Sequence, residues 1–317
     1  MLTSTHQAGH ERRPAAPDDA ASAYDLAGAG YVAYADGDAL RPLDFSSRYG
    51  HADRQIWARI DAMLTGLAAS GRTSLRVLDA GCGPGTWLLR LARRAAALGF
   101  TDIAADGFDI SGTMIELARG AAAALEAPGL RLSFTVADAT EPLPFTDGAF
   151  DLCLCLYGVL NHIPRPAMHA VAAELARVTA GTLFVTVRTV GSLPTIYIDG
   201  VEKAAAWRQD NSLDRLDIDM RDGTHVSFVS HLFSARELEA LFAAKLSMQQ
   251  VTGLDLFHSR FAPHPHWNPA IGDEGEFQHD LDELERRYAH SRHFLDRASH
   301  ILLTGRSLPP GQGRRPG

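Results

Sequence analysis

The stretch "RVLDAGCGPGTW", residues 76–87, decides the fold of this chain. A largely apolar run leads into Asp79, and three glycines then follow at every second position, Gly81, Gly83 and Gly85. Such a run, ending in an acid and a glycine-rich turn, is typical of a strand buried on both faces of a parallel sheet. A turn needs only one glycine, so the other two predict that something approaches the backbone of this loop closely.

The rest of the chain alternates short apolar runs with helical segments, which is the pattern of an α/β fold. We expect strands over residues 75–80, 103–109, 132–137, 150–157 and 182–189, and helices over 86–97, 112–125 and 167–178. After residue 189 the alternation breaks, and residues 190–223 are predicted to form a cap insertion with a helical middle. Further strands are expected over 225–233, 248–258 and 300–307, and a charged helix over 276–297. Another helix begins after Ser234, which forms a capping-box pattern with Glu237.

Composition excludes several classes of protein. The chain has 317 residues with a formal net charge of −8 and no basic stretch in its body, so we expect no nucleic acid or anionic membrane as partner. No segment approaches the ~20 apolar residues of a membrane span, and the N-terminus lacks the apolar region of a secretory signal. The three cysteines form no CxxC pair, which favours reduced thiols and a cytoplasmic location. Cys153 and Cys155, two residues apart on one strand, are expected to be buried.

Three acids end the first three predicted strands, at Asp79, Asp109 and Asp138. The carboxyl ends of parallel strands meet at one crevice, where ligands of such sheets bind. Thr86 stands where the third glycine of a dinucleotide-binding fingerprint would stand, and Pro84 removes an N–H that a phosphate would need. These features and the three carboxylates disfavour a pyrophosphate, and they suit a nucleoside that carries a positive charge.

On these residues the chain resembles the class I S-adenosylmethionine-dependent methyltransferases that act on small molecules. "VLDAGCGPGTW" is similar to the first motif of that family, and "ADATEPLPFTDGAFDLCLCLYGVLNHI" is similar to its adenine motif and fourth strand. The resemblance covers residues from about Leu75 to about Thr189. It implies a seven-stranded, doubly wound and mostly parallel α/β sheet of order 3-2-1-4-5-7-6. It also implies S-adenosyl-L-methionine as the cofactor and S-adenosyl-L-homocysteine as the product.

The resemblance also assigns positions around the cofactor. Asp109 would bind the ribose, Asp138 and Ala139 the adenine, and the backbone of Leu156 and Tyr157 would face the methionine amino group. The full expected cofactor-binding set is Asp79, Gly81, Gly83, Gly85, Asp109, Ile110, Asp138, Ala139, Leu156, Tyr157 and Arg48. The expected organisation is a disordered leader over residues 1–20, a helical lid over 21–74, the Rossmann-like domain over 75–307 with the cap insertion at about 190–223, and a flexible tail over 308–317.

Two candidates for catalysis follow the fourth strand, and Tyr49 in the leader is the third. His162 would act as a base or as a hydrogen-bond partner of the acceptor, or it simply packs the loop at a helix start, and Asn161 carries the same alternatives. In the leader, Tyr24, Tyr31 and Tyr34 share one helical face, and Arg48 and Tyr49 are the expected contacts of a lid over the cofactor. The alternative is that these aromatic residues only dock the leader on the core.

The expected substrate-binding residues are Tyr24, Tyr31, Arg188 and Tyr197. Trp207 either lines an acceptor pocket or packs in the core, and the second interpretation is favoured. The H-x-H spacing in "HPHW", residues 264–267, has no further ligand at a recognisable interval, so no metal is expected.

The leading hypothesis is methyl transfer to a small-molecule acceptor by in-line displacement. Two alternatives stay open. The bound sulfonium could undergo other chemistry, an intramolecular cyclisation or a lyase-type reaction, or the chain could bind S-adenosylmethionine without catalysis. The acceptor atom is left open, and a homodimer is compatible with the sequence.

Overall fold

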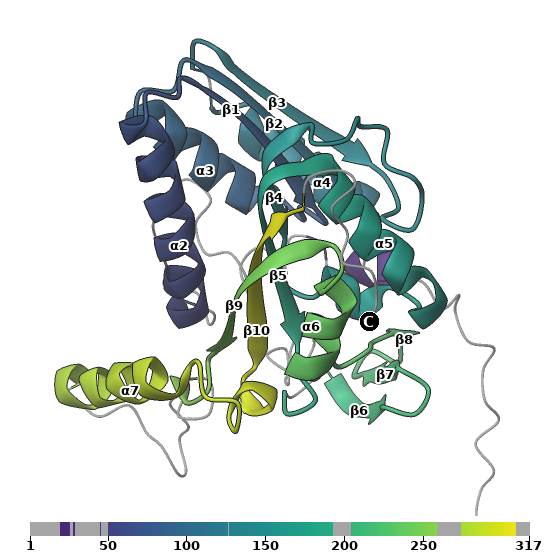
Figure 1. Ribbon diagram of the computed structural model, residues 1–317. Coiled ribbons are helices and arrows are strands. Elements are labelled where there is room, and N and C mark those ends of the chain that lie inside the picture. The colour runs from purple at the N-terminus through teal and green to yellow at the C-terminus, as the bar shows by residue number, and fades with distance from the viewer. Residues whose placement is uncertain are drawn as a thin grey trace, which may run out of the picture.

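The computed structural model describes residues 20–25, 28, 45, 50–125, 127–192, 204–258 and 274–308 (Figure 1). Its main sheet has seven strands: β1 (Ser74–Ala80), β2 (Asp102–Asp109), β3 (Leu130–Val136), β4 (Phe150–Cys155), β5 (Thr179–Arg188), β9 (Leu246–Leu254) and β10 (His300–Ser307). Their order is β3-β2-β1-β4-β5-β10-β9. β10 runs antiparallel to both of its neighbours, and the first five strands are parallel. Because β9 and β10 are the sixth and seventh strands of this sheet along the chain, the predicted order is confirmed.

Helices cover both faces of the main sheet. The core on one face contains residues of α2 (Gly50–Ala69), α3 (Thr86–Ala97) and α4 (Gly112–Ala122). The core on the other face contains residues of α5 (Arg165–Val178) and α6 (Ala235–Phe242). Alternate residues of β4 point to the two cores, so Cys153 and Cys155 share the second one and are fully buried, as predicted. None of the helices in the described part of the chain has the length and apolar character of a membrane span.

The cap insertion is a small sheet, and its predicted helical middle is wrong where the structure describes it. β6 (Ala204–Asp210), β7 (Arg215–Met220) and β8 (His225–Val229) form an antiparallel sheet in that order. The signal was present in "RLDIDM", where buried Leu216 and Ile218 alternate with aspartates at the period of a strand. Trp207 lies on the edge strand β6 and is 44% exposed, so the expectation that it packs in the core was also wrong.

The predicted lid over residues 21–74 divides into two parts of different character. Residues 20–25 are helical and pack against the cap sheet, where Ala23 belongs to a small core with Leu216 and Phe228. α2 instead forms a layer of the main domain, with Ile56 and Ile60 fully buried in the core on its face of the sheet. Most of the segment between these two parts lies outside the described residues.

Two ion pairs join α2 to α3, and they differ in burial. Asp53 Oδ2 lies 3.4 Å from Arg90 Nη1, and both side chains are 1% exposed. Asp61 Oδ1 lies 2.5 Å from Arg94 Nε, yet these side chains are 33% and 35% exposed. Water screens the second pair, whereas removing Asp53 leaves the buried Arg90 charge uncompensated. Burial, and not the shorter distance, therefore decides which pair matters for stability.

We expect Asp53→Ala to lower the free energy of unfolding by about 3–5 kcal/mol, as for other broken buried ion pairs. Asp61→Ala, on the same helix, serves as the matched control and should cost less than about 1 kcal/mol. Urea denaturation followed by circular dichroism measures both values. Equal losses in the two variants would show that burial does not separate these pairs.

Candidate cofactor pocket at the carboxyl edge of the sheet

A pocket of about 300 Å³ lies where β1 to β4 end, at the carboxyl edge of the sheet. Most of the predicted cofactor-binding residues line it, namely Asp79, Gly81, Gly83, Asp109, Ile110, Asp138, Ala139, Leu156 and Tyr157. Gly85 is not among the lining residues, and Arg48 lies outside the described residues. The sequence pattern thus identified one continuous surface, although these residues are spread along almost eighty positions of the chain.

The three glycines of the opening stretch serve two different purposes. At Gly81 a Cβ atom would lie 2.2 Å from Val159 Cγ2, so this glycine permits close packing of the segment after β4. At Gly85 a Cβ atom would lie 3.0 Å from Phe134 Cε1, which makes that glycine a packing position as well. At Gly83 a Cβ atom would meet nothing within 4 Å, and this glycine lines the pocket. Gly83 therefore leaves open the space that a ligand needs to reach the loop.

Asp109 is held in place by the backbone on both of its oxygens. Gly83 N–H donates to Oδ2 at 2.9 Å, and Ser111 N–H donates to Oδ1 at 2.9 Å. Burial raises the pKa of Asp109, the bonds from these N–H groups oppose the rise, and the nearby Asp25 carboxylate adds to it. Each carboxylate oxygen keeps a lone pair for a further donor. A pair of hydroxyl groups, such as those of a ribose, suits this fixed acceptor.

Asp79 and Asp138 bring two more carboxyl groups to the same pocket. Asp79 is 2% exposed at the end of β1. Asp138 follows β3 and accepts a hydrogen bond from Thr140 N–H at 2.8 Å. Apolar side chains such as Ile110, Met114 and Leu156 form other parts of the wall. Carboxylates beside apolar walls fit a flat, polar nucleoside with a positive charge, so the residues present match S-adenosylmethionine.

Tyr24 of the N-terminal helix lines this pocket and contacts His162. His162 ends the short helix η1 (Val159–His162), and its Nδ1 lies 2.8 Å from the carbonyl oxygen of Val229, which only accepts. In the neutral ring Nδ1 therefore carries the proton, and Nε2 accepts the hydrogen bond from Tyr24 Oη at 3.0 Å. Burial and the nearby charge of Arg188 lower the pKa of His162 to about 4, although the bond to Val229 opposes this. Such a ring is a weak base, which favours the hydrogen-bonding role over proton abstraction.

The side chain of Asn161 is buried and hydrogen-bonded to backbone groups. It is fully buried, and its Nδ2 donates to the carbonyl oxygens of Arg188 and His231. Its Oδ1 accepts from Arg188 N–H at 2.9 Å. The side-chain amide thus ties η1 to the end of β5 and to the segment after β8, and Asn161 itself is not among the residues that line the pocket in the described part of the chain. The predicted catalytic role of Asn161 stays a prediction, beside the alternative that the residue packs this loop.

Arg188 is 2% exposed at the end of β5 and does not line the pocket in the described part of the chain. Its predicted contact with the substrate stays a prediction. Tyr31, Tyr49 and Tyr197 lie outside the described residues, so their predicted roles also stay predictions.

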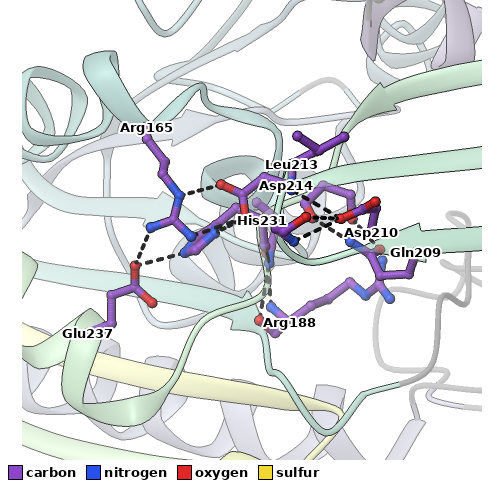
Figure 2. Close-up of polar contacts among 11 residues, drawn as sticks. Arg165, Arg188, Gln209, Asp210, Leu213, Asp214, His231 and Glu237 are labelled. Atoms are coloured by element: carbon purple, nitrogen blue, oxygen red, sulfur yellow. Dashed lines mark hydrogen bonds and ion pairs between the residues drawn. The ribbon is translucent and has the colours of Figure 1, made fainter.

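A polar cluster that the sequence did not indicate anchors the cap beside the pocket (Figure 2). His231 lies between two acids, with Nδ1 2.8 Å from Asp214 and Nε2 2.9 Å from Glu237. Arg165 at the start of α5 donates to both of these carboxylates. The cluster joins the β6–β7 turn, the segment after β8 and the start of α6, and so it fixes the strand end that carries Val229, the partner of His162.

Residues 77–181 match a family model described as a methyltransferase domain. This match covers the segment from β1 to the first residues of β5, which contains the glycine turn and the three strand-ending acids. The residues that line the pocket fit S-adenosylmethionine, the cofactor that a methyltransferase domain of this fold implies. None of the curated proteins matches the chain.

Several solved structures resemble the chain. A methyltransferase from Methanosarcina mazei is 17% identical over 75% of this chain and 95% of its own, with a TM-score of 0.47. The CcbJ methyltransferase from Streptomyces caelestis is 13% identical over 79% of this chain and 89% of its own, with a TM-score of 0.46. Magnesium protoporphyrin IX methyltransferase from Synechocystis is 18% identical over 82% of this chain and 86% of its own, with a TM-score of 0.44.

The lowered pKa of His162 predicts how stability depends on pH. The folded protein keeps the ring neutral down to about pH 4, whereas the unfolded chain takes up a proton near the ordinary value of 6.5. This contribution to stability is therefore complete above pH 6.5 and is lost as the pH falls toward 4. His162→Gln should reduce the slope of unfolding free energy against pH in this window by up to about 1.4 kcal/mol per pH unit. Urea denaturation at several pH values between 4.5 and 7 measures the slope.

His169→Gln is the control for this measurement, because His169 is exposed on α5. It should leave the slope of the wild-type protein unchanged. The same slope in both variants and the wild type would mean that His162 titrates alike in the folded and unfolded states.

Proposed function

We propose that the chain transfers a methyl group from S-adenosylmethionine to a small-molecule acceptor. The observation that carries this proposal is one pocket that contains both the three carboxylates and the Tyr24–His162 pair. The carboxylates suit the nucleoside and its positive charge. The tyrosine and the neutral imidazole suit a second, uncharged molecule beside it.

Different residues of the pocket would bind different parts of the cofactor. Asp109 would accept hydrogen bonds from the ribose hydroxyls, and Asp138 from the adenine amino group. Asp79 and the backbone after β4 would hold the methionine end. When bound, S-adenosylmethionine would supply an electrophilic methyl group that a lone pair of the acceptor attacks, with the C–S bonding electrons returning to sulfur and the proton of the acceptor passing to solvent.

His162 and Tyr24 would orient the acceptor. A neutral imidazole Nε2 accepts a hydrogen bond, so an acceptor hydroxyl or amine can take the place that Tyr24 Oη holds. Ile163, Pro164 and Val229 give this part of the pocket an apolar surface. Correct alignment of two reactants alone accounts for about 7–11 kcal/mol of barrier in well-oriented systems, so a strong base is not required.

A small acceptor is favoured over a macromolecule by what surrounds the pocket. The leader helix contributes Ala20 and Tyr24 to the lining, and the cap sheet contributes Val229. In this proposal both elements would cover the acceptor and help to exclude water from it. The net charge of −8 also disfavours nucleic acid as the acceptor.

Calorimetric titration with S-adenosylmethionine and S-adenosylhomocysteine tests the cofactor part of this proposal. We expect Asp109→Ala to weaken both ligands about 100-fold, because it removes charge-assisted hydrogen bonds worth roughly 1.5–3 kcal/mol each. Asp102→Ala is the matched control, since Asp102 lies at the opposite end of β2, where it pairs with exposed Arg131. Equal affinities in the two variants would remove Asp109 from the site.

Mass spectrometry of the products then separates transfer from the alternatives. Methyl transfer yields S-adenosylhomocysteine only when an acceptor is present. The acceptor is then recovered with its mass increased by that of one CH₂ group. Formation of methylthioadenosine without any acceptor would instead indicate intramolecular chemistry on the sulfonium. Binding with neither product across a broad set of small nucleophiles would favour a protein that only binds the cofactor.

A further inference from the structure

A second group of ligand-forming side chains lies outside the pocket. His51 lies in the first turn of α2, His258 follows β9, and Glu285 belongs to α7 (Glu274–Tyr288). One ligand atom from each of these three residues lies within 4.8 Å of the other two. Asp282, one turn before Glu285, lies beside both imidazoles. Three elements that are distant in sequence thus bring two imidazoles and two carboxyl groups together.

One distance within this group matches that between two ligands of one ion, and the other is that of a hydrogen bond between two candidate ligands. His51 Nδ1 lies 3.3 Å from Asp282 Oδ1, and His258 Nε2 lies 2.8 Å from the same oxygen. Two donor atoms that each lie about 2.1 Å from a tetrahedral zinc ion are about 3.4 Å apart. The imidazole rings are stacked, with centroids 4.0 Å apart and planes 20° apart. Both rings therefore direct a nitrogen toward one small region.

The group is also held in place by its surroundings. His51 is 8% and Glu285 is 3% exposed. Glu285 accepts hydrogen bonds from the N–H groups of Leu256, Phe257 and His258, which fixes the backbone that carries the second imidazole. The side chain of Asp282 is 51% exposed. Three of the four groups are thus fixed on the inside, and the fourth can move aside and leave a path from solvent.

We propose that His51, His258, Asp282 and Glu285 form a binding site for a divalent transition-metal ion of the zinc type. Imidazole with carboxylate is a ligand set typical of Zn²⁺, and it also binds Mn²⁺, Fe²⁺, Co²⁺ and Ni²⁺. The two imidazoles separate this site from the all-oxygen sites that Mg²⁺ and Ca²⁺ prefer. The expectation that the chain binds no metal was based on the H-x-H pair of His264 and His266. The four residues proposed here are brought together only by folding.

The site lies at the same edge of the sheet as the cofactor pocket. Leu254 at the end of β9 is paired with His300, which is paired with Arg188 at the end of β5. Two residues after His51, Asp53 accepts a hydrogen bond from Tyr157, which lines the pocket. A bound ion would fix the first turn of α2 and, through Asp53, that wall of the pocket. The proposal does not rest on the proposed function, because metal binding is measured without cofactor or acceptor.

The test uses the full chain, freed of any affinity tag, stripped with a chelator and then desalted. The protein is equilibrated with ZnCl₂, desalted again and analysed for zinc by mass spectrometry, and CoCl₂ is used in parallel for its visible absorption. We expect about one equivalent of zinc per chain and a Co²⁺ spectrum of nitrogen and oxygen ligands. His258→Gln and Asp282→Asn should each weaken zinc at least about tenfold in competition with a chromogenic chelator.

His279→Gln and Asp280→Asn are the matched controls, because both residues are exposed on α7 outside the group. These variants should bind zinc as the wild-type protein does. A further variant, His264→Gln with His266→Gln, tests the H-x-H pair of the sequence. Circular dichroism checks the fold, and Asp282→Asn keeps the test decisive if His258→Gln unfolds, since Asp282 is half-exposed.

Three outcomes would overturn the proposal. In the first, the wild-type protein retains no zinc after equilibration with ZnCl₂ and desalting. In the second, the two site variants bind zinc as well as the controls do. In the third, only the variant of His264 and His266 loses zinc. Loss confined to His258→Gln and Asp282→Asn, with the controls unchanged, supports it.

Discussion

The hydrogen bonds between the glycine turn and the end of β2 are the interaction on which the pocket depends. The N–H groups of Gly81 and Cys82 both donate to the carbonyl oxygen of Phe108, and Gly83 N–H donates to the side chain of Asp109. These bonds continue the β1–β2 pairing past the last strand residues. The turn, the acid and the start of α4 therefore form one rigid unit, because Asp109 also accepts from Ser111 at the cap of that helix.

A second set of contacts connects this unit to α2. Tyr157 has a positive φ of 54°, a conformation that non-glycine residues rarely adopt, and its hydroxyl donates to Asp53. Asp53 also pairs with Arg90 of α3, and Arg90 lies over the ring of Trp87, a further lining residue of the pocket. One buried carboxylate thus holds two walls of the pocket. Asp53 matters for stability and lies close to the site for the same reason, namely that its partners are buried.

The sheet and the cofactor side of the pocket were predictable because their determinants are local. Apolar runs, strand-ending acids and glycines lie close together in the sequence, and a parallel sheet places its strand ends at one edge. The acceptor side was less predictable. The pKa and the tautomer of His162 depend on Val229, which is 67 residues away. The role of Asn161 depends equally on backbone groups of distant segments.

Dependence on distant contacts also explains why the sequence did not predict the strand β6 of the cap or the proposed metal site. A helix was expected in the middle of the cap, but residues 204–210 pair with β7 as the strand β6, since tertiary contacts override weak local preferences. His51 and His258 are more than two hundred positions apart, so no spacing in the sequence relates them. Ligand spacings reveal a metal site only when its residues share one element or one loop.

Three consecutive residues of the leader connect three parts of the molecule. Ala23 packs on the cap sheet, Tyr24 donates to His162, and Asp25 accepts hydrogen bonds from Ser111 Oγ and Thr113 N–H at the start of α4. Docking of the leader therefore brings a further carboxylate close enough to raise the pKa of Asp109. A positively charged ligand beside these carboxylates lowers their mutual repulsion. If the pocket binds the positively charged cofactor proposed above, ligand binding and leader docking would favour each other by linkage. The negative charge of the pocket would then also help to hold the leader over that ligand.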